Sequence, residues 1–171
     1  MLRDRGSRTA VAACLLTLLS GCSSSGDDAS APTAEPSAAA PEVGQRIEQT
    51  ADAVLGGVEL TLEVADEAEE RAVGLMGRTE VPAGTGMVFL FDEPVNSSFY
   101  MFQVPIPLRA TFVRDGVVVG VVDMPPCEQE QPDDCPLYGP GTSYDTVVET
   151  APETLPGLEV GARLEPARPG A

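Results

Sequence analysis

The sequence predicts an all-β fold: a small antiparallel β-sandwich or barrel with one short α-helix over about residues 66–76. Residues 58–64 alternate strictly between apolar and polar side chains, which is typical of a half-buried strand. Further along the chain, short runs of branched and aromatic residues are separated by turns rich in Gly, Pro and Asp. Only one segment has helical periodicity. Because parallel strands are usually connected through helices, we expect an antiparallel sheet.

The composition excludes several functional classes. The 171 residues include ten Arg, 27 acidic residues and neither Lys nor His, for a net charge of −17. Without histidine, the chain has no Ser-His-Asp or Cys-His catalytic system and no His-containing zinc site. The excess of negative charge argues against electrostatic binding of nucleic acid or of an anionic lipid surface. We therefore expect no nucleic-acid partner and no cofactor.

The N-terminal segment predicts a lipoprotein signal peptide over residues 1–21. Three arginines precede a mostly apolar run over residues 10–19, which is too short to span a bilayer as a helix. Ser20 and Gly21 then precede Cys22, a pattern that resembles the bacterial lipobox. We expect the Cys22 thiol to take a diacylglyceryl group and the mature protein to carry palmitate-type acyl chains. The predicted location is the extracytoplasmic face of the cell membrane.

A tether and a single domain are expected to follow. Residues 22–52 are rich in Ser, Ala, Pro and acids, and this composition does not bury enough apolar surface to fold. The predicted globular domain covers residues 53–166, with a C-terminal tail over residues 167–171. Loss of the signal peptide removes three arginines and one aspartate, so the mature chain has a net charge of −19.

The helix is expected between the first strand and the rest of the sheet. Asp66 is a candidate N-cap, with Glu69 three residues later completing a capping box, and Gly77 is a plausible end. The apolar side chains that fall on one helical face are Ala68, Ala72, Leu75 and Met76.

Five further runs are predicted as strands, at residues 87–91, 99–103, 110–113, 117–122 and 144–149. Asp115 and Gly116 suit a two-residue hairpin turn with positive φ, so the third and fourth of these runs are expected to pair.

Cys127 and Cys135 are predicted to form a structural disulfide, because an even pair of cysteines in an exported protein is usually oxidised. A redox role is the weaker interpretation. The spacing is not Cys-x-x-Cys, and the four acids between the two cysteines suppress the thiolate.

Three ordered motifs resemble the domain of unknown function 192 family. They are GLMGR at residues 74–78, GMVFLF at 86–91 and FYMFQVPIPLR at 99–109. The resemblance covers about residues 58–164 and implies a small β-rich fold, but the family has no settled activity. Tyr100 stands where the family usually has Trp, and Arg109 where it usually has Asp.

Arg78, Arg109, Tyr100 and Phe102 are the candidate ligand-binding residues. An arginine near a glycine-rich turn is suited to hold a carboxylate or phosphate through two hydrogen bonds, and Arg109 is a second cation near a proline-rich bend. The alternative is that Arg78 pairs with an acid of the domain or caps the helix carbonyls.

No set of catalytic residues is evident. Met76, Met87 and Met101 are soft thioether ligands of the kind that Cu(I) selects, but they also suit an apolar core. Carboxylate pairs for glycan hydrolysis arise by chance among so many acids. We therefore expect a non-catalytic, membrane-anchored module that binds a small anion or an envelope protein. A carboxylate-based hydrolase of envelope polymers and a methionine-based Cu(I) carrier are the alternatives.

Overall fold

The computed structural model describes residues 43–44 and 46–170. The predicted signal peptide, Cys22 and most of the predicted tether lie outside these residues. Within the described part, no helix is both long and apolar enough to cross a membrane.

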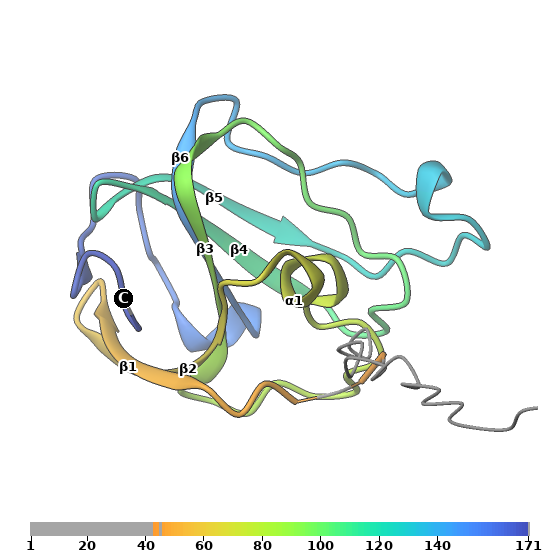
Figure 1. Cartoon of the computed structure of the whole chain (residues 1–171), viewed down its shortest axis with the longest axis horizontal. Coiled ribbons are helices and arrows are strands. Elements are labelled where there is room, and N and C mark those ends of the chain that lie inside the picture. Colours follow the sequence, from red (N-terminus) through yellow and green to blue (C-terminus); the bar gives the residue numbers. More distant parts are fainter. Residues whose placement is uncertain (1–42, 45, 171) are drawn as a thin grey trace, which may run out of the picture. The chain divides into compact units, whose positions relative to one another are not determined.

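The domain is a curled seven-stranded sheet with one short α-helix, so the predicted all-β fold is confirmed (Figure 1). Along the sheet the strand order is β5-β4-β6-β3-β2-β1-β7. The elements in chain order are β1 (Thr50–Leu55), β2 (Val58–Ala65), α1 (Ala68–Val73), β3 (Thr85–Val95), β4 (Leu108–Arg114), β5 (Val117–Met124), the 3₁₀ turn η1 (Pro132–Asp134), β6 (Tyr144–Thr150), the 3₁₀ turn η2 (Pro152–Thr154) and β7 (Leu164–Glu165).

Hydrogen bonds connect the two ends of the curled sheet. Val117 on β5 forms an isolated antiparallel bridge with Arg163, which immediately precedes β7. The Leu164 N–H also donates to the Gly116 carbonyl oxygen at 3.0 Å. Edge strands expose unpaired backbone groups, and these contacts satisfy part of both edges.

The expectation of a purely antiparallel sheet is wrong for one pair of strands. β2 and β3 are parallel, in a register that aligns Thr61 with Thr85 and Ala65 with Phe89. The chain runs from β2 to β3 through α1, as Figure 1 shows. A six-residue helix with its flanking turns is enough for this crossover, so a second helix is not needed.

The strand prediction differs from the structure at three places. Residues 99–103 form a loop in which only Phe99 makes an isolated bridge, to Tyr138. β7 was not predicted, and β1 begins at Thr50, inside the segment expected as tether. The hairpin turn is as predicted, because Asp115 and Gly116 have φ values of 51° and 73° between β4 and β5.

Helix α1 begins one residue later than predicted. Glu67, rather than Asp66, is the N-cap, and it forms a reciprocal capping box with Glu70 in place of Glu69. The helix ends before Gly77, at Gly74, whose φ of 49° an L side chain rarely adopts. A Cβ at Gly74 would also lie 3.2 Å from the Phe89 ring, so glycine suits this position in two ways.

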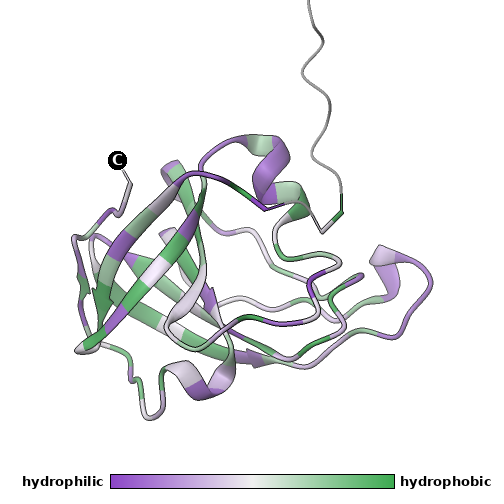
Figure 2. Cartoon of the chain, turned by 90° about the horizontal axis from the view of Figure 1, so that it is seen from below, coloured by the Kyte–Doolittle hydropathy of each residue, from purple (hydrophilic) through white to green (hydrophobic). Residues whose placement is uncertain are grey.

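Both faces of the sheet are buried, each against its own core. Along β3, Val88 and Leu90 belong to one cluster, while Met87 and Phe89 belong to the other. Figure 2 shows hydrophobic residues along the strands of the sheet, with hydrophilic stretches among them. The second cluster includes Leu75 from the turn after α1 and Met101 from the loop before β4, so it connects the sheet to these segments.

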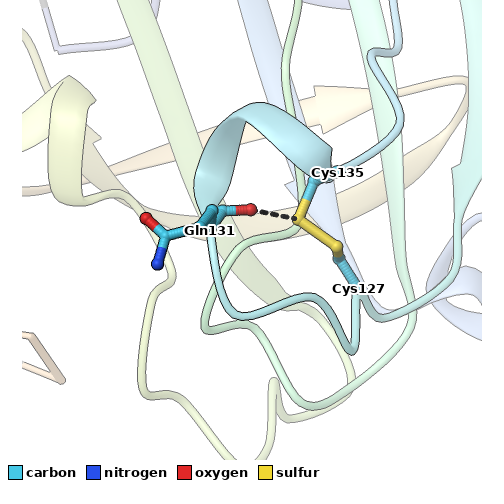
Figure 3. The surroundings of a disulfide bond; sticks show 3 residues. All are labelled: Cys127, Gln131 and Cys135. Atoms are coloured by element: carbon cyan, nitrogen blue, oxygen red, sulfur yellow. Dashed lines mark hydrogen bonds between the residues drawn. A yellow bond between two sulfur atoms is a disulfide. The ribbon is translucent and has the colours of Figure 1, made fainter.

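The Cys127–Cys135 disulfide closes a short loop around η1 (Figure 3). The Cα atoms of the two cysteines are 5.8 Å apart, and the Gln131 carbonyl oxygen lies 4.0 Å from the Cys135 Sγ. Because a disulfide sulfur carries no hydrogen, this contact is not a donated hydrogen bond. The disulfide that the sequence predicts is thus present.

Candidate functional site

Arg78 is part of a buried ion pair. It follows the turn after α1, only 7% of its surface is exposed, and its guanidinium donates to both Glu63 carboxylate oxygens at 2.9 and 2.6 Å. Glu63 on β2 also accepts the Ile47 N–H at 2.8 Å. Burial opposes ionisation of Glu63, but these hydrogen bonds and the charges of Arg78 and Arg46 outweigh it and lower its pKa. Arg78 therefore links the turn to β2.

Arg109 is bound to a different part of the sheet. Its guanidinium donates to both carboxylate oxygens of Asp123 on β5, at 2.6 and 3.0 Å, and to the Leu155 carbonyl oxygen at 2.8 Å. The hydrogen bonds to Asp123 raise the pKa of Arg109 despite its partial burial. Arg78 and Arg109 thus each have a carboxylate partner within the domain, and neither lines the pocket described next.

A pocket of about 260 Å³ lies beside α1. The helical face predicted to be apolar supplies one wall: Ala68, Ala72, Leu75 and Met76 all line the pocket. Leu75 is buried, whereas Ala68 and Ala72 are exposed. The apolar face of α1 is therefore only partly covered by the protein core, and the remainder faces the pocket.

The opposite walls come from β3 and from the loop before β4. Phe89 and Phe91 project from β3, while Phe99, Tyr100 and Met101 come from the loop. Tyr100 keeps 38% of its surface exposed, which places it at the rim. Phe102, the other predicted aromatic residue, is not among the residues that line the pocket.

The loop that forms this wall is held in place by several contacts. Phe99 and Tyr138 exchange two backbone hydrogen bonds of 2.8 Å, and the Tyr144 hydroxyl donates to the Ser97 carbonyl oxygen at 2.8 Å. The Phe99 ring meets the Phe89 ring edge to face, with centroids 5.2 Å apart. The pocket is therefore formed in part by residues whose positions are fixed without a ligand.

Glu149 is a buried acid that lines the same pocket. It lies on the central strand β6, directly between Met87 on β3 and Ala110 on β4, and only 5% of its surface is exposed. Its carboxyl group has no hydrogen-bond or ion-pair partner among the described residues. Burial accordingly raises its pKa from 4.5 to about 8. At neutral pH, the group is mostly a neutral carboxylic acid.

Gly86 allows β3 to approach Glu149 closely. A Cβ at Gly86 would lie 2.2 Å from the Glu149 carbonyl oxygen, a distance at which the backbone would have to shift. This contact gives a physical reason for the glycine of the GMVFLF motif, which packs directly against the strand that carries the buried acid.

Arg71 is the cation that lines the pocket. Its Nη1 donates to the Leu90 carbonyl oxygen at 3.0 Å and to the Asp66 carbonyl oxygen, and the guanidinium stacks 5.2 Å from the Phe91 ring centroid. These contacts hold the guanidinium against β3, and Arg71 is not among the groups that shift the pKa of Glu149.

The methionines do not form one cluster in the pocket. Met76 and Met101 line it, whereas Met87 is fully buried in the core next to Glu149. Among the described residues, no group of three or more His, Cys, Asp or Glu side chains is placed to hold a metal ion.

Of the four residues that the sequence predicts for ligand binding, Tyr100 alone lines this pocket, and Glu149 was not among them. The signal available was its position two residues after Val147, which places both side chains on the same buried face of β6. From the sequence alone, an acid at the end of an apolar strand is expected to be exposed to solvent. That it is buried becomes evident only once its strand is placed between two other strands.

Comparisons with known proteins agree with the fold and assign no activity. The sequence profile of the domain of unknown function 192 family, described as "Uncharacterized ACR", matches residues 50–166. No curated protein matches the chain.

Two crystal structures are similar to the domain. One is a Sinorhizobium meliloti 1021 protein provisionally described as a transcription regulator, with 25% identity and a TM-score of 0.59 over 68% of this chain and 92% of that chain. The other is a Novosphingobium aromaticivorans DSM 12444 protein of unknown function, with 27% identity and a TM-score of 0.57 over 74% of this chain and 93% of that chain.

Proposed function

Because the chain belongs to the uncharacterized domain of unknown function 192 family, we propose its function from the pocket beside α1. The domain is a non-catalytic module that binds a small, mainly apolar ligand there. A lipid on Cys22 holds it at the extracytoplasmic face of the cell membrane. The observation that carries the binding proposal is the apolar face of α1, which faces the pocket instead of being covered by the core.

The chemistry of the walls supports this class of ligand. Small-molecule sites are concave, mostly apolar and contain a few polar groups that orient the ligand. Here, aromatic and aliphatic side chains from α1, β3 and the loop before β4 form the walls, and the Glu149 carboxyl group supplies a polar contact. Apolar contacts with the ligand would bury the helical surface that the core leaves open.

A small anion is a less favourable ligand for this site. Arg78 and Arg109, the arginines predicted to bind it, already hold Glu63 and Asp123. An anion would have to displace one of these carboxylates, and Glu149 is an unfavourable neighbour for a second negative charge.

The geometry gives less support to the two chemical alternatives. Glycoside hydrolysis uses two carboxyl groups across a cleft, and Glu149 is the only acid among the described residues that line the pocket. A Cu(I) site would need its thioethers to converge, and Met87 lies in the core rather than in the pocket wall.

The similar Sinorhizobium meliloti protein is described as a transcription regulator, but the charge of this chain argues against a function in DNA binding. A net charge of −17 repels the phosphate backbone, which contributes most of the affinity in non-specific DNA binding.

A pocket-filling substitution tests the binding proposal. We expect the chain without residues 1–22, which lacks the predicted signal peptide and lipid-attachment site and is purified without detergent, to bind members of a panel of benzyl, cyclohexylmethyl and hexyl alcohols and amines in calorimetric titrations. Adding Ala72→Phe should weaken this binding at least tenfold, because the ring would occupy the pocket from the exposed face of α1.

Ala83→Phe is the matched control, since Ala83 is also exposed but does not line the pocket. The control should bind as the parent chain does. Absence of binding across the whole panel, or an equal loss in both variants, would contradict the proposed function.

A further inference from the structure

Resting on the proposed function of this pocket, we propose that its ligand is an apolar amine whose ammonium group pairs with the Glu149 carboxylate. The observation behind this is Glu149 itself: only 5% of the residue is exposed, it lines the pocket, and its carboxyl group has no partner among the described residues. The apolar walls would enclose the hydrocarbon part of the ligand, and the buried acid would select its head group.

The position of Glu149 makes this pairing specific. The residues opposite it on the two adjacent strands are Met87 and Ala110, and neither of these side chains carries a hydrogen-bond donor. A buried polar group without a partner destabilises the fold, and the cost is recovered when a ligand supplies that partner. Hydrogen bonds between oppositely charged groups are also about twice as strong as those between neutral groups.

The other titratable residues that line the pocket do not pair with Glu149. On α1, Arg71 is held by the Leu90 and Asp66 carbonyl oxygens and stacks on Phe91. On the loop, Tyr100 is the other titratable residue that lines the pocket. The net charge of −17 favours the approach of a cation over that of an anion.

Binding of an ammonium ion would release one proton. In the empty pocket, the Glu149 carboxyl group is mostly protonated below pH 8, since burial raises its pKa to about 8. When R–NH₃⁺ enters, the carboxyl group gives its proton to the buffer and its oxygen accepts a hydrogen bond from the ammonium. No bond in the ligand breaks and nothing is oxidised or reduced. Below about pH 8, the affinity for the amine should therefore rise by up to about tenfold with each unit of increase in pH.

Matched ligands separate this inference from the proposed function. Benzylamine and benzyl alcohol differ only in the head group, and each is titrated into the chain without residues 1–22 at pH 6 and pH 8 in two buffers of different ionisation enthalpy. We expect benzylamine to bind at least about tenfold more tightly than benzyl alcohol at pH 8. Its affinity should fall at pH 6, where the buffer dependence of the heat should report release of close to one proton.

Glu149→Gln keeps the shape of the side chain and removes its charge. The variant should lose the preference for benzylamine and its pH dependence, while still binding benzyl alcohol. If the variant does not fold, the pH dependence and the proton release of the parent chain still decide the question.

Each outcome separates the two proposals. Equal affinities for the alcohol and the amine, without proton release, would overturn the amine inference and leave the binding module in place. Binding of neither compound would contradict the inference, and the full panel described above decides whether the proposed function fails with it.

Discussion

The most informative residue is Glu149, because its position on the central strand places a carboxyl group where an apolar side chain would be more stable. It shares its buried face with Val147 and lies between Met87 and Ala110. Glu63 shows the opposite arrangement, because this partly buried acid has Arg78 as a hydrogen-bonded partner and a lowered pKa. The domain therefore has a partly buried acid with an arginine partner, Glu63, and a buried acid without one, Glu149, and of these two only Glu149 lines the pocket beside α1.

The stability of the fold should depend on pH through Glu149. In the unfolded chain this acid ionises near its usual pKa of 4.5, whereas in the fold its pKa is about 8. Between these values the folded state binds the extra proton, so the free energy of unfolding falls as pH rises, by up to about 1.4 kcal/mol per pH unit. From pH 5 to pH 7 the contribution is roughly 2 to 3 kcal/mol, and above about pH 8 it levels off.

Glu149→Gln should remove this contribution, so the variant should gain stability relative to the parent as pH rises. Urea unfolding of both proteins at pH 5, 6, 7 and 8 measures the difference. Glu153→Gln, at an exposed position nearby, serves as the control and should follow the parent at every pH. A constant difference between Glu149→Gln and the parent would contradict the raised pKa.

Residue patterns alone predicted Arg78 as a candidate but not its partner. The notable arginine of the GLMGR motif is visible in the sequence, whereas Glu63 is one of 27 acids and pairs with it only because β2 lies next to the turn after α1. For the same reason Glu149 was missed. Which acid is buried depends on contacts between strands that are distant in the sequence, and periodicity does not report these contacts.

At the scale of elements, local patterns predicted the strands and the helix well. Alternation identified β2, and the Asp115-Gly116 turn identified the β4–β5 hairpin, because both signals depend on neighbouring residues. Residues 99–103 were wrongly expected to be a strand, since their aromatic and apolar side chains line the pocket and the core rather than one face of the sheet. The parallel β2–β3 pair was missed because its crossover helix is only six residues long.

The loop closed by the Cys127–Cys135 disulfide should contribute measurably to stability. The disulfide connects cysteines eight positions apart, and restricting the unfolded chain in this way stabilises by roughly 2 to 3 kcal/mol in the chain-entropy account. We expect the Cys127→Ser/Cys135→Ser double variant to lose this amount in urea unfolding.

The parent protein unfolded under reducing conditions is the control and should match the double variant. Because the cysteines do not line the pocket, benzyl alcohol binding should be unchanged in the folded double variant. A double variant as stable as the oxidised parent would contradict the structural role of the disulfide.

For the whole molecule, we propose that the anchor and the tether hold an acidic domain away from the membrane surface. The net charge of −17 is a property of the full chain, and the residues before the domain contain the predicted lipid-attachment site. The predicted tether connects that site to a sheet that begins at Thr50. Its length and its acidic residues would keep the negatively charged domain away from anionic lipid headgroups, so that the mouth of the pocket remains accessible.

Anchoring by Cys22 gives a direct test at this scale. In a bacterial host that processes lipoproteins, the parent chain should remain with the membrane fraction after a high-salt wash, because acyl chains hold it by burial of hydrocarbon rather than by charge. Cys22→Ala should remove the site of acylation and of cleavage, and with them the acyl mass on the protein.

Cys14→Ala changes the other cysteine of the N-terminal segment and is the matched control, since Cys14 lies within the apolar run. We expect that control to stay in the membrane and to keep the acylated mass. If the Cys22→Ala protein still carries acyl chains, or if Cys14→Ala loses them, the lipid is not on Cys22 and the proposed anchor is wrong.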